Sequence, residues 1–584
     1  MLKNRLRIDI LSIIQSLGFS DGDIVCDIPR NFEFGDYTTN IALQLAKLKK
    51  GDDKQTARDI ANKICQKLQR LEYIEKVTVA GPSDGGGFIN IWIKPESLLQ
   101  NLVKVCNYST FVEPKFTLGE ADKKILIEYA SFNALKPVHF GHLRNLILGE
   151  SLARLVETQG NQVFRVTYTA DIGLQIAKTI WGIYQLKKEF DQAQKQDLKE
   201  KSLFLGKAYA LGANLYEDDQ FAKSEIQRIN TQIYQKEKKI VSLYQKIVGW
   251  SFDYFDDIYA RMGTKFDRKF NESEVQESGK KLVLDNVGKI FKEDQGAIIF
   301  AGSEHGLHNR VFISSTGNPT YEAKDMALAE AQFKAFPFDL AIHVVANEQD
   351  DYFKVIFKAL EVLYPKIASR ERHLSYGMVN LSTGKMSSRK GNVITFESIY
   401  EQTAEKIAEV MKGSQKKNKE QFADGEKDNV IHAVTVGAIK FTMLRYSPQT
   451  NFAFDINKSV ALSGDSGPYV QYTYSRAKSI LRNAAYSYQP AKLEADSFEK
   501  EERQILQKIE HFESIVSKAA ENYQPNLIAN FLLELARLFN LFYQNHKVLD
   551  AGEKQQLRLA LTCAVAVTLR QGLYLLGIET VERM

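Results

Sequence analysis

The clearest change of hydrophobic period in the chain lies between residues 125 and 160. Residues 125–127 are consecutive apolar positions that end in a polar turn, as in a strand buried on both faces of a parallel sheet. Apolar residues then recur at helical spacing until Gly160, and residues 163–168 alternate like a second strand. The pattern predicts a βαβ unit, with His139-Phe140-Gly141-His142 at the turn where its helix begins.

Strand and helix patterns continue downstream of this unit. Strand patterns at 296–300, 311–314 and 340–345 are followed by a helical pattern at 352–363. Strands that alternate with helices in this way predict a doubly wound parallel sheet. A helical stretch at about 191–262 interrupts the region, and its charge run beside apolar positions favours an amphipathic helix pair with a solvated face over a nucleic-acid stripe.

The first 115 residues or so combine helices with strands. Helical patterns cover the start of the chain, 39–49 and 56–71, and strand patterns lie near Val77 and at 88–93. The glycines at 85–87 lead into the last strand and no helix follows them, so we interpret them as a hairpin turn and not as a phosphate-binding loop. This part of the sequence predicts a small α+β domain.

From about residue 400 onward the strand signals disappear. The remaining patterns are helical and lie at 398–411, 431–444, 466–483, 498–521, 525–545 and 554–575. Short helices separated by turns predict an all-α bundle. Tyr469 and Tyr472 lie near Arg476 within it, and aromatic rings interleaved with cations can stack on unpaired nucleobases. Aromatic residues of a bundle core are the alternative interpretation.

Composition sets only broad limits. The 584 residues are 44% hydrophobic and 26% charged, which is typical of a globular protein with several domains. A net charge of +5 permits a nucleic-acid partner without requiring one. The four scattered cysteines show no metal-binding spacing and are typical of a reducing compartment, and no apolar run is long enough for a membrane span. The basic start of the chain fits an ordinary helix better than a transit peptide, so we expect a cytoplasmic protein.

Two histidines at a strand-to-helix turn favour an anion site. His139 and His142 would place imidazole donors beside a helix N-terminus, where the helix dipole already attracts negative charge. Gly141 between them would let a flat ring approach the backbone. A nucleoside triphosphate site follows, although a metal-binding pair or two unrelated surface histidines would produce the same spacing.

A second polar segment lies about 245 residues further along. Residues 384–392, GKMSSRKGN, place Lys385, Arg389 and Lys390 with Ser387 and Ser388 between glycines. Such a loop can close over a polyphosphate, or it can be a plain exposed turn. The loop and the histidine pair, at the two sides of one sheet, together indicate a nucleotide site more specifically than either motif does alone.

These motifs resemble those of the class I arginyl-tRNA synthetases. HFGH is similar to the HIGH signature of class I, and KMSSRKGN is similar to its KMSKS loop. NFEFGDYTTNIALQLAK and GGFINI resemble the N-terminal tRNA-binding domain of the arginyl family, and SFNALKPVHFGHLRN its extended first signature. TYEAKDMALAE resembles its substrate-binding helix, and SGPYVQYTYSRAKSIL with LLGIETVERM its anticodon-binding bundle.

The resemblance implies a domain order and a reaction. It implies an N-terminal α+β tRNA-binding domain at 1–115, a Rossmann-like catalytic domain at 116–400, a helical connecting segment at 401–464 and an anticodon-binding domain at 465–584. The reaction would use ATP and Mg²⁺ to attach L-arginine to tRNA(Arg) through an arginyl-adenylate. We expect a monomer with no membrane contact and no metal site of its own. A synthetase for another amino acid and a non-catalytic tRNA-binding paralogue are the alternatives.

Several side chains suit arginine. Tyr321 and Asp325 are four residues apart on an expected helix and therefore share a face, and Glu272 lies in a motif that supplies a further carboxylate in the family. A planar guanidinium with five donors matches two carboxylates and a phenol, although both acids would otherwise be taken as solvated. The resemblance places Asn133 at the amino group of the substrate and Gln349 near the same pocket.

The phosphate residues include one departure from the family pattern. Ser388 stands where KMSKS has its second lysine, and related synthetases that lack this lysine carry one just before the first signature, where Lys136 stands here. We therefore expect Lys136 to stabilise the leaving pyrophosphate together with Lys385, Arg389 and Lys390. His139, Gly141, His142, Met386, Ser387 and Ser388 are expected to contact ATP, and Asn90, Tyr469, Tyr472 and Arg476 to contact tRNA.

Overall fold

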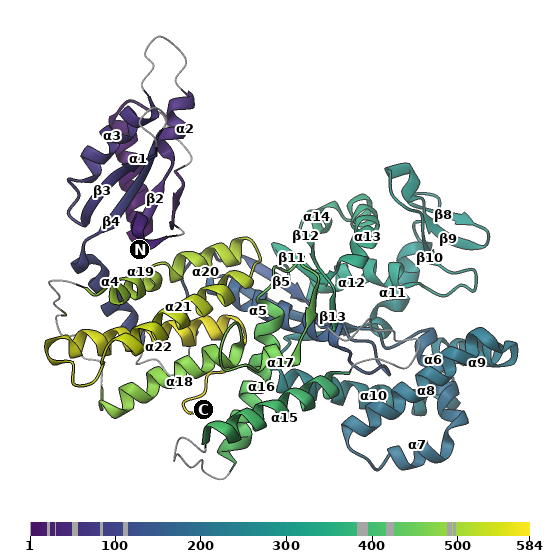
Figure 1. Ribbon diagram of the computed structural model, residues 1–584. Coiled ribbons are helices and arrows are strands. Elements are labelled where there is room, and N and C mark those ends of the chain that lie inside the picture. Colours follow the sequence, from purple (N-terminus) through teal and green to yellow (C-terminus); the bar gives the residue numbers. More distant parts are fainter. Residues whose placement is uncertain are drawn as a thin grey trace.

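A five-stranded parallel sheet lies at the centre of the molecule, with strand order β12-β11-β5-β6-β7 (Figure 1). The strands are β5 (Lys124–Glu128), β6 (Gln162–Thr169), β7 (Arg268–Asn271), β11 (Leu340–Ala346) and β12 (Glu371–Tyr376). The computed structural model describes residues 2–19, 24–29, 31–48, 56–81, 86–108, 115–381, 395–415, 425–486, 493 and 498–584.

The βαβ unit expected from the sequence is confirmed. α5 (Phe140–Thr158) connects β5 to β6, which pair in parallel. Leu126 packs on one face of the sheet, in a cluster with α12 (Tyr321–Ala335) and α13 (Asp350–Leu363). Ile125 and Ile127 pack on the other face, in the cluster that contains α5. Alternate residues of one strand thus serve two cores, as a doubly wound sheet requires.

Two strands predicted for this sheet lie elsewhere. β9 (Ala297–Phe300) and β10 (Arg310–Ile313) form a separate antiparallel sheet with β8 (Phe291–Asp294), at the far right of Figure 1. Gln295 and Gly296 both have positive φ, 48° and 77°. A two-residue turn of this kind joins antiparallel neighbours, so β8 and β9 cannot be parallel strands of the central sheet.

Helices carry the chain away from the sheet between β6 and β7. They are α6 (Leu174–Gln185), α7 (Lys187–Ala193), α8 (Leu198–Asp218), α9 (Gln220–Tyr234) and α10 (Lys238–Arg261). The stretch predicted as a helix pair therefore contains more helices, because Asp197 and Asp219 cap new helices within it. α11 (Glu272–Leu284) and α14 (Pro365–Ala368) complete the helices around the central sheet.

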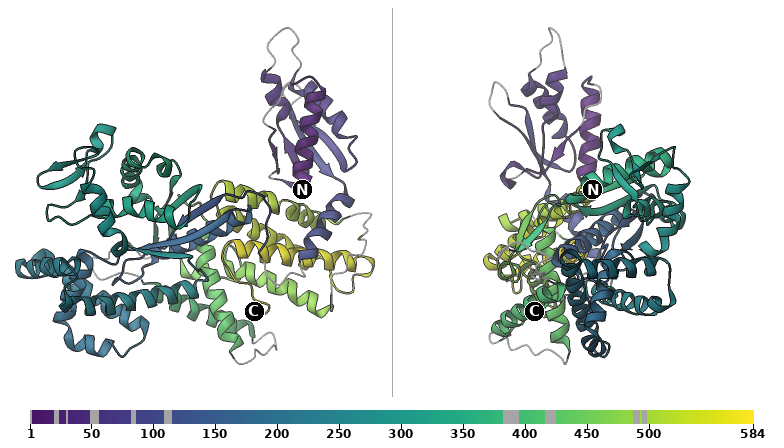
Figure 2. Two further views of the ribbon diagram at one scale, coloured as in Figure 1. Left: turned by 180° about the vertical axis from the view of Figure 1, so that it is seen from behind. Right: turned by 90° about the vertical axis from the view of Figure 1, so that its right-hand side faces the viewer.

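The N-terminal part stands out from the rest of the molecule in both views of Figure 2. It comprises α1 (Leu2–Ser16), β1 (Cys26–Asp27), β2 (Tyr37–Thr39), α2 (Ile41–Leu48), α3 (Ala57–Leu68), β3 (Ile74–Ala80), β4 (Phe88–Ile93) and α4 (Pro95–Asn107). Its strands form an antiparallel sheet, and β3 pairs with β4 as the predicted hairpin requires. α4 leaves this sheet and packs against the last helix of the chain.

The C-terminal half is almost entirely helical. Its helices are α15 (Phe396–Gln415), α16 (Glu426–Leu444), α17 (Ile456–Ser459), α18 (Gly467–Asn483), α19 (Lys500–Glu510), α20 (Phe512–Glu521), α21 (Asn526–Asn545) and α22 (Gln555–Leu575). The pattern predicted at 498–521 divides into two helices at His511. A short strand, β14 (Phe452–Phe454), also lies in the segment predicted as helical, where it pairs with β13 (Val379–Leu381).

In the part of the chain that the structure describes, no helix is both long and apolar enough to cross a membrane.

Candidate functional site

Three of the residues expected to bind ATP, His139, Gly141 and His142, lie at the carboxyl edge of the parallel sheet. β5 ends at Glu128, and the chain passes Asn133 and Lys136 before α5 begins beyond His139. Asn133 forms a bridge with Ala170, directly after the end of β6. The bridge joins the segments that follow two neighbouring strands, and this places the histidines above the edge of the sheet.

His139 and His142 form a reciprocal cap at the start of α5. The backbone N–H of His142 donates to Nδ1 of His139 at 3.3 Å, and that of His139 donates to Nδ1 of His142 at 3.4 Å. The two rings stack with centroids 3.6 Å apart. A Cβ at Gly141 would lie 3.1 Å from the His139 ring, so glycine keeps this stack undisturbed.

Both imidazoles are neutral in this arrangement. Burial lowers the pKa of His139 to about 4, helped by the nearby charge of Lys136, and burial lowers the pKa of His142 well below its ordinary value. Because each Nδ1 accepts a backbone hydrogen bond, the single ring proton lies on Nε2. The pair therefore offers two N–H donors without a net charge.

Lys136 lies close to both histidines. Its Nζ is 4.6 Å from the ring centre of Tyr209, which belongs to α8. Gly206 of the same helix packs against Pro137 so closely that a Cβ there would lie 2.6 Å from the proline ring. The helical insertion thus contacts the segment that carries the lysine, and a cation–π contact holds the ammonium group near the turn.

The second expected phosphate element, Lys385, Met386, Ser387, Ser388, Arg389 and Lys390, lies outside the described residues. The described residues on its two sides are near the histidines. Thr395 forms a bridge with His139, and the backbone N–H of Phe396 donates to the carbonyl of Val138 at 2.8 Å. β13 ends at Leu381, and its partner β14 contributes Phe454, which contacts Phe140 of α5. The roles of this loop remain predictions.

Arg144 and Asn145 fix the start of α5. Arg144 is buried and donates to the carbonyls of Pro448 and Thr450 at 2.8 and 3.0 Å. Burial lowers its pKa to about 10. Asn145 donates to the carbonyl of Val344 in β11. Arg144 and Asn145 thus hold the start of α5 against neighbouring backbone segments. The sequence analysis assigned them no role.

Asp325 of α12 lies near Glu128, the last residue of β5, and Glu272, which follows β7. It accepts a hydrogen bond of 2.5 Å from the hydroxyl of Tyr352 in α13. Burial raises its pKa to about 8, and the nearby carboxylates of Glu128, Glu272 and Glu322 add to the shift. A carboxyl group with such a pKa is in surroundings that lack positive charge.

Glu272, the first residue of α11, is buried and paired. Lys324 donates to its carboxylate at 2.5 Å, and only 5% of the lysine side chain is exposed. Burial nevertheless raises the pKa of Glu272. The lysine that neighbours Asp325 in sequence therefore neutralises part of the acidic pocket, and neither this lysine nor its ion pair was foreseen from the sequence.

The remaining expected arginine residues lie around the same pocket at different depths. Tyr321 is 54% exposed, and its ring centre is 5.5 Å from that of Tyr352. Gln349 is exposed and precedes the first turn of α13, three residues before Tyr352. The predicted positions of Tyr321 and Asp325 on one helix are confirmed by α12. Their contacts with a substrate remain predictions.

Three further polar side chains at this edge were missed. Glu128 ends β5, and Tyr168 lies near the end of β6. Asp171 follows β6 and accepts hydrogen bonds from the backbone and side chain of Ser273 at 2.9 and 2.6 Å. They could have been identified as candidate site residues from the sequence, because ligands bind at the carboxyl ends of parallel strands.

The residues expected to contact tRNA fall in two places. Tyr472 and Arg476 of α18 line a cavity of about 740 Å³, which Tyr543, His546 and Arg583 also line. Tyr469 is tied to Asn540 of α21 by a hydrogen bond of 3.0 Å. Asn90 lies on β4, where it is buried and accepts a hydrogen bond from Thr38. The contacts of these residues with tRNA remain predictions.

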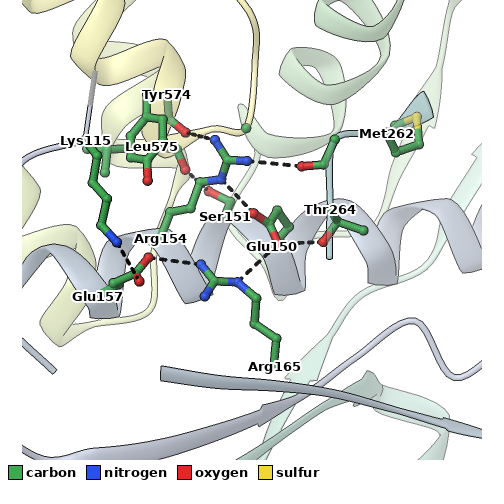
Figure 3. A network of polar contacts seen from close by, with 12 residues as sticks. Lys115, Glu150, Ser151, Arg154, Glu157, Arg165, Met262, Thr264, Tyr574 and Leu575 are labelled. Carbon is green, nitrogen blue, oxygen red and sulfur yellow. Dashed lines mark hydrogen bonds and ion pairs between the residues drawn. The ribbon is translucent and has the colours of Figure 1, made fainter. Parts of the chain in front are cut away.

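The carboxyl end of α22 is attached to α5, as Figure 3 shows. Ser151 donates to the carbonyl of Leu575 at 2.8 Å, and Arg154 donates to the carbonyl of Tyr574 at 3.0 Å. Arg154 also pairs with the buried Glu150 at 2.7 Å. The helix that begins at the histidines therefore caps the last helix of the bundle.

Replacing Arg154 by alanine should lower the free energy of unfolding by about 3 kcal/mol, because it leaves the buried Glu150 with one cation fewer and removes a donor from the carbonyls of Tyr574 and Gly263. Urea denaturation followed by circular dichroism measures this. Arg228→Ala is the control, since that arginine pairs with Glu225 on an exposed helix surface, and its loss should cost under about 0.5 kcal/mol. Equal stability of the two variants would contradict the role of Arg154.

Among the described residues, no group of three or more His, Cys, Asp and Glu side chains is arranged to hold a metal ion.

A family model for the catalytic domain of class I tRNA synthetases, the (R) type, matches residues 112–456. Models for the arginyl tRNA synthetase N-terminal domain and the DALR anticodon binding domain match residues 4–93 and 470–584.

Curated relatives and a solved structure match the chain over most of their length. An arginine–tRNA ligase of Flavobacterium psychrophilum is 30% identical over 91% of this chain and 90% of its own, and one of Porphyromonas gingivalis is 29% identical over 94% of both. The solved structure of Thermus thermophilus arginyl-tRNA synthetase superposes over the whole of both chains with a TM-score of 0.80 at 24% identity. This last likeness supports the fold.

A parallel sheet with a His-x-Gly-His turn at the start of its first crossover helix defines a class I aminoacyl-tRNA synthetase. The matches to all three family models and to the curated relatives are more specific. The chain belongs to the arginyl-tRNA synthetase family.

Proposed function

We propose that this protein attaches L-arginine to tRNA(Arg) in two steps. The carboxylate of arginine attacks the α-phosphate of ATP and releases pyrophosphate, and the arginyl group of the resulting adenylate then passes to the terminal adenosine of the tRNA. The observation that carries the proposal is a cluster of carboxyl groups around Tyr168, here called the acidic pocket, at the edge of the same sheet as the stacked histidines.

The pocket fits a guanidinium group. Its carboxyl groups are those of Glu128, Asp171, Glu272 and Asp325, whose charges all act on the buried hydroxyl of Tyr168. Lys324 compensates Glu272, and His343 pairs with Glu128. Asp325 and Asp171 have no such cation within hydrogen-bond distance among the described residues. The cationic side chain of a substrate can therefore pair with these two carboxyl groups.

On the ATP side, the chain supplies neutral donors and one nearby cation. The Nε2–H groups of His139 and His142 would donate to phosphate oxygens at the amino end of α5, where the helix dipole adds positive potential. Lys136, with the loop that contains Lys385 and Lys390, would stabilise charge on the leaving pyrophosphate. Positioning and electrostatics account for most of the catalysis in such a transfer.

Mg²⁺ would enter with ATP. The described residues offer no dedicated metal cluster, which fits an ion held chiefly by phosphate oxygens and water. The ion would supply charge neutralisation at the phosphates when bound.

For tRNA, the proposed contacts are the cavity beside Tyr472 and Arg476 in the bundle and the surface near Asn90 in the N-terminal part. A cavity of about 740 Å³ is large enough for an unstacked nucleobase, and its aromatic and cationic lining suits one. We further propose that the chain acts as a monomer in the cytoplasm, with functional units at 1–115, 116–400, 401–464 and 465–584.

Exchange of labelled pyrophosphate into ATP tests the function. The assay is run with each of the twenty amino acids, with and without total tRNA. Exchange with arginine alone among the amino acids is the expected result. Exchange with another amino acid would reveal a different specificity, and tRNA binding without any exchange would indicate a paralogue without catalysis.

Arginine binding should release a proton near neutral pH. The pKa of Asp325 is about 8 in the free protein, so its carboxyl group is mostly protonated at pH 7. The guanidinium selects the ionised form and lowers this pKa, so affinity should rise with pH up to about 8 and then level off. Calorimetric titration in buffers of different ionisation enthalpy should detect nearly one proton per arginine at pH 7. Asp325→Asn should abolish the release, and release unchanged in that variant would exclude Asp325 as its source.

A further inference from the structure

Tyr168 lies at the centre of the acidic pocket. It is the second-last residue of β6 and pairs in register with Phe270, two residues before Glu272. Its ring packs against the apolar cluster beneath α12 and α13, which includes Phe270 and Tyr352. The side chain therefore points to the face of the sheet on which Asp325 is carried.

The hydroxyl of Tyr168 is buried without a partner. Within the described residues, no hydrogen-bonding atom lies in reach of it. A buried hydroxyl in this state destabilises the fold relative to one that is hydrogen-bonded. Buried polar atoms are satisfied almost everywhere in folded proteins, so this exception needs an explanation.

The surroundings of the hydroxyl are unusual in charge. Burial raises the pKa of Tyr168 well above its ordinary value, and the charges of Asp325, Glu272, Glu128 and Asp171 raise it further. Other buried tyrosines of this region are bonded: Tyr352 donates to Asp325, and Tyr244 donates to Asp171. Tyr168 thus remains a neutral phenol whose oxygen can accept a hydrogen bond from a cation.

We infer that Tyr168 is a further specificity-determining residue, whose hydroxyl oxygen accepts a hydrogen bond from the guanidinium group of bound arginine. The inference rests on the proposed function, since it requires arginine to occupy this pocket. It explains why an unpaired hydroxyl persists at the end of β6: the protein without substrate tolerates the loss, and the substrate supplies the missing donor.

Tyr168→Phe is the test, because it removes only the hydroxyl oxygen. The KM for arginine in aminoacylation should rise roughly 10- to 100-fold, the range for a hydrogen bond to a charged group. At saturating arginine, kcat should stay within about twofold of the unmodified protein. The melting temperature should stay equal or rise, since the variant loses an unsatisfied polar atom from the interior.

Tyr73→Phe is the matched control. Tyr73 is also packed in an apolar core, but its hydroxyl donates to Asp9 at 2.6 Å in the N-terminal part. Its removal should lower the melting temperature and leave the KM for arginine unchanged. A raised KM without loss of stability in Tyr168→Phe, and the reverse in Tyr73→Phe, would indicate that the Tyr168 hydroxyl binds the substrate and does not stabilise the fold.

Two results would overturn the inference. A KM within twofold of the unmodified value would show that the hydroxyl does not touch arginine, and a lower melting temperature with a parallel fall in kcat would show a structural role. Calorimetric titration of the unmodified protein with arginine separates this failure from that of the proposed function. If arginine binds and Tyr168→Phe binds it equally well, only the inference fails; if arginine does not bind at all, both fail.

Discussion

Replacing Lys136 by alanine should reduce the rate of arginine activation by about 10²- to 10³-fold. The Nζ of Lys136 lies near both histidines, over the ring of Tyr209, and its charge lowers their pKa values. A cation at this place acts on charge that develops as pyrophosphate leaves, and little of that charge is present when arginine binds. The fall should therefore appear in kcat of ATP–pyrophosphate exchange, with arginine affinity kept within twofold.

Lys201→Ala is a suitable control for this change. Lys201 lies on α8, the helix that carries Tyr209, and its Nζ is 5.3 Å from the ring centre of Trp250, so it makes a cation–π contact comparable to that of Lys136. It should leave the exchange rate unaltered. If Lys136→Ala were as active as the control, Lys136 would not stabilise the leaving pyrophosphate, and Lys385, Arg389 or Lys390 would have that role.

Changing Asp325 to asparagine should lower kcat/KM for arginine by roughly 30- to 800-fold, or about 2–4 kcal/mol. The amide has nearly the same shape and can still accept from Tyr352, so the pocket keeps its packing while it loses a charge that a guanidinium needs. Discrimination against lysine should also weaken, because two of the remaining acids, Glu272 and Glu128, are already paired with Lys324 and His343. Aminoacylation with labelled arginine and, separately, with labelled lysine at several concentrations measures both effects.

The control for this second change lies on the same helix. Glu330 pairs with Lys334 across one turn of α12, and the lysine side chain is 73% exposed. Glu330→Gln should leave kcat/KM within about twofold. A drop of less than threefold in Asp325→Asn would mean that arginine is selected by other groups.

The local fold around the histidines could be predicted because one short stretch contains every signal for it. A buried strand, a capping turn, a helix with apolar residues at helical spacing and a glycine stop follow one another between residues 125 and 160, and each appears in the structure. The strands at 297–300 and 310–313 were placed wrongly because their apolar pattern is the same in either sheet. The backbone conformation at Gln295 and Gly296 directs β9 back along β8, and the spacing of apolar residues does not encode that conformation.

The site was predictable to a similar degree. His139, Lys136 and Asp325 are recognised from motifs, and the structure brings them to one edge of the sheet. The neutral state of the histidines and the pairing of Glu272 with Lys324 depend on burial by segments far apart in sequence. Tyr168 has no motif at all, since its unpaired hydroxyl is a property of the packed interior.

The attachment of α22 to α5 has a consequence for the evolution of the molecule. One continuous apolar cluster includes Leu6 of the N-terminal part, Ile127 of the central sheet, Leu146 of α5 and Leu573 of α22. Segments that read as separate modules along the chain thus share one interior. An exchange of the anticodon-reading bundle between relatives would have to carry matching changes on α5, so the two regions are under selection as a single inherited unit.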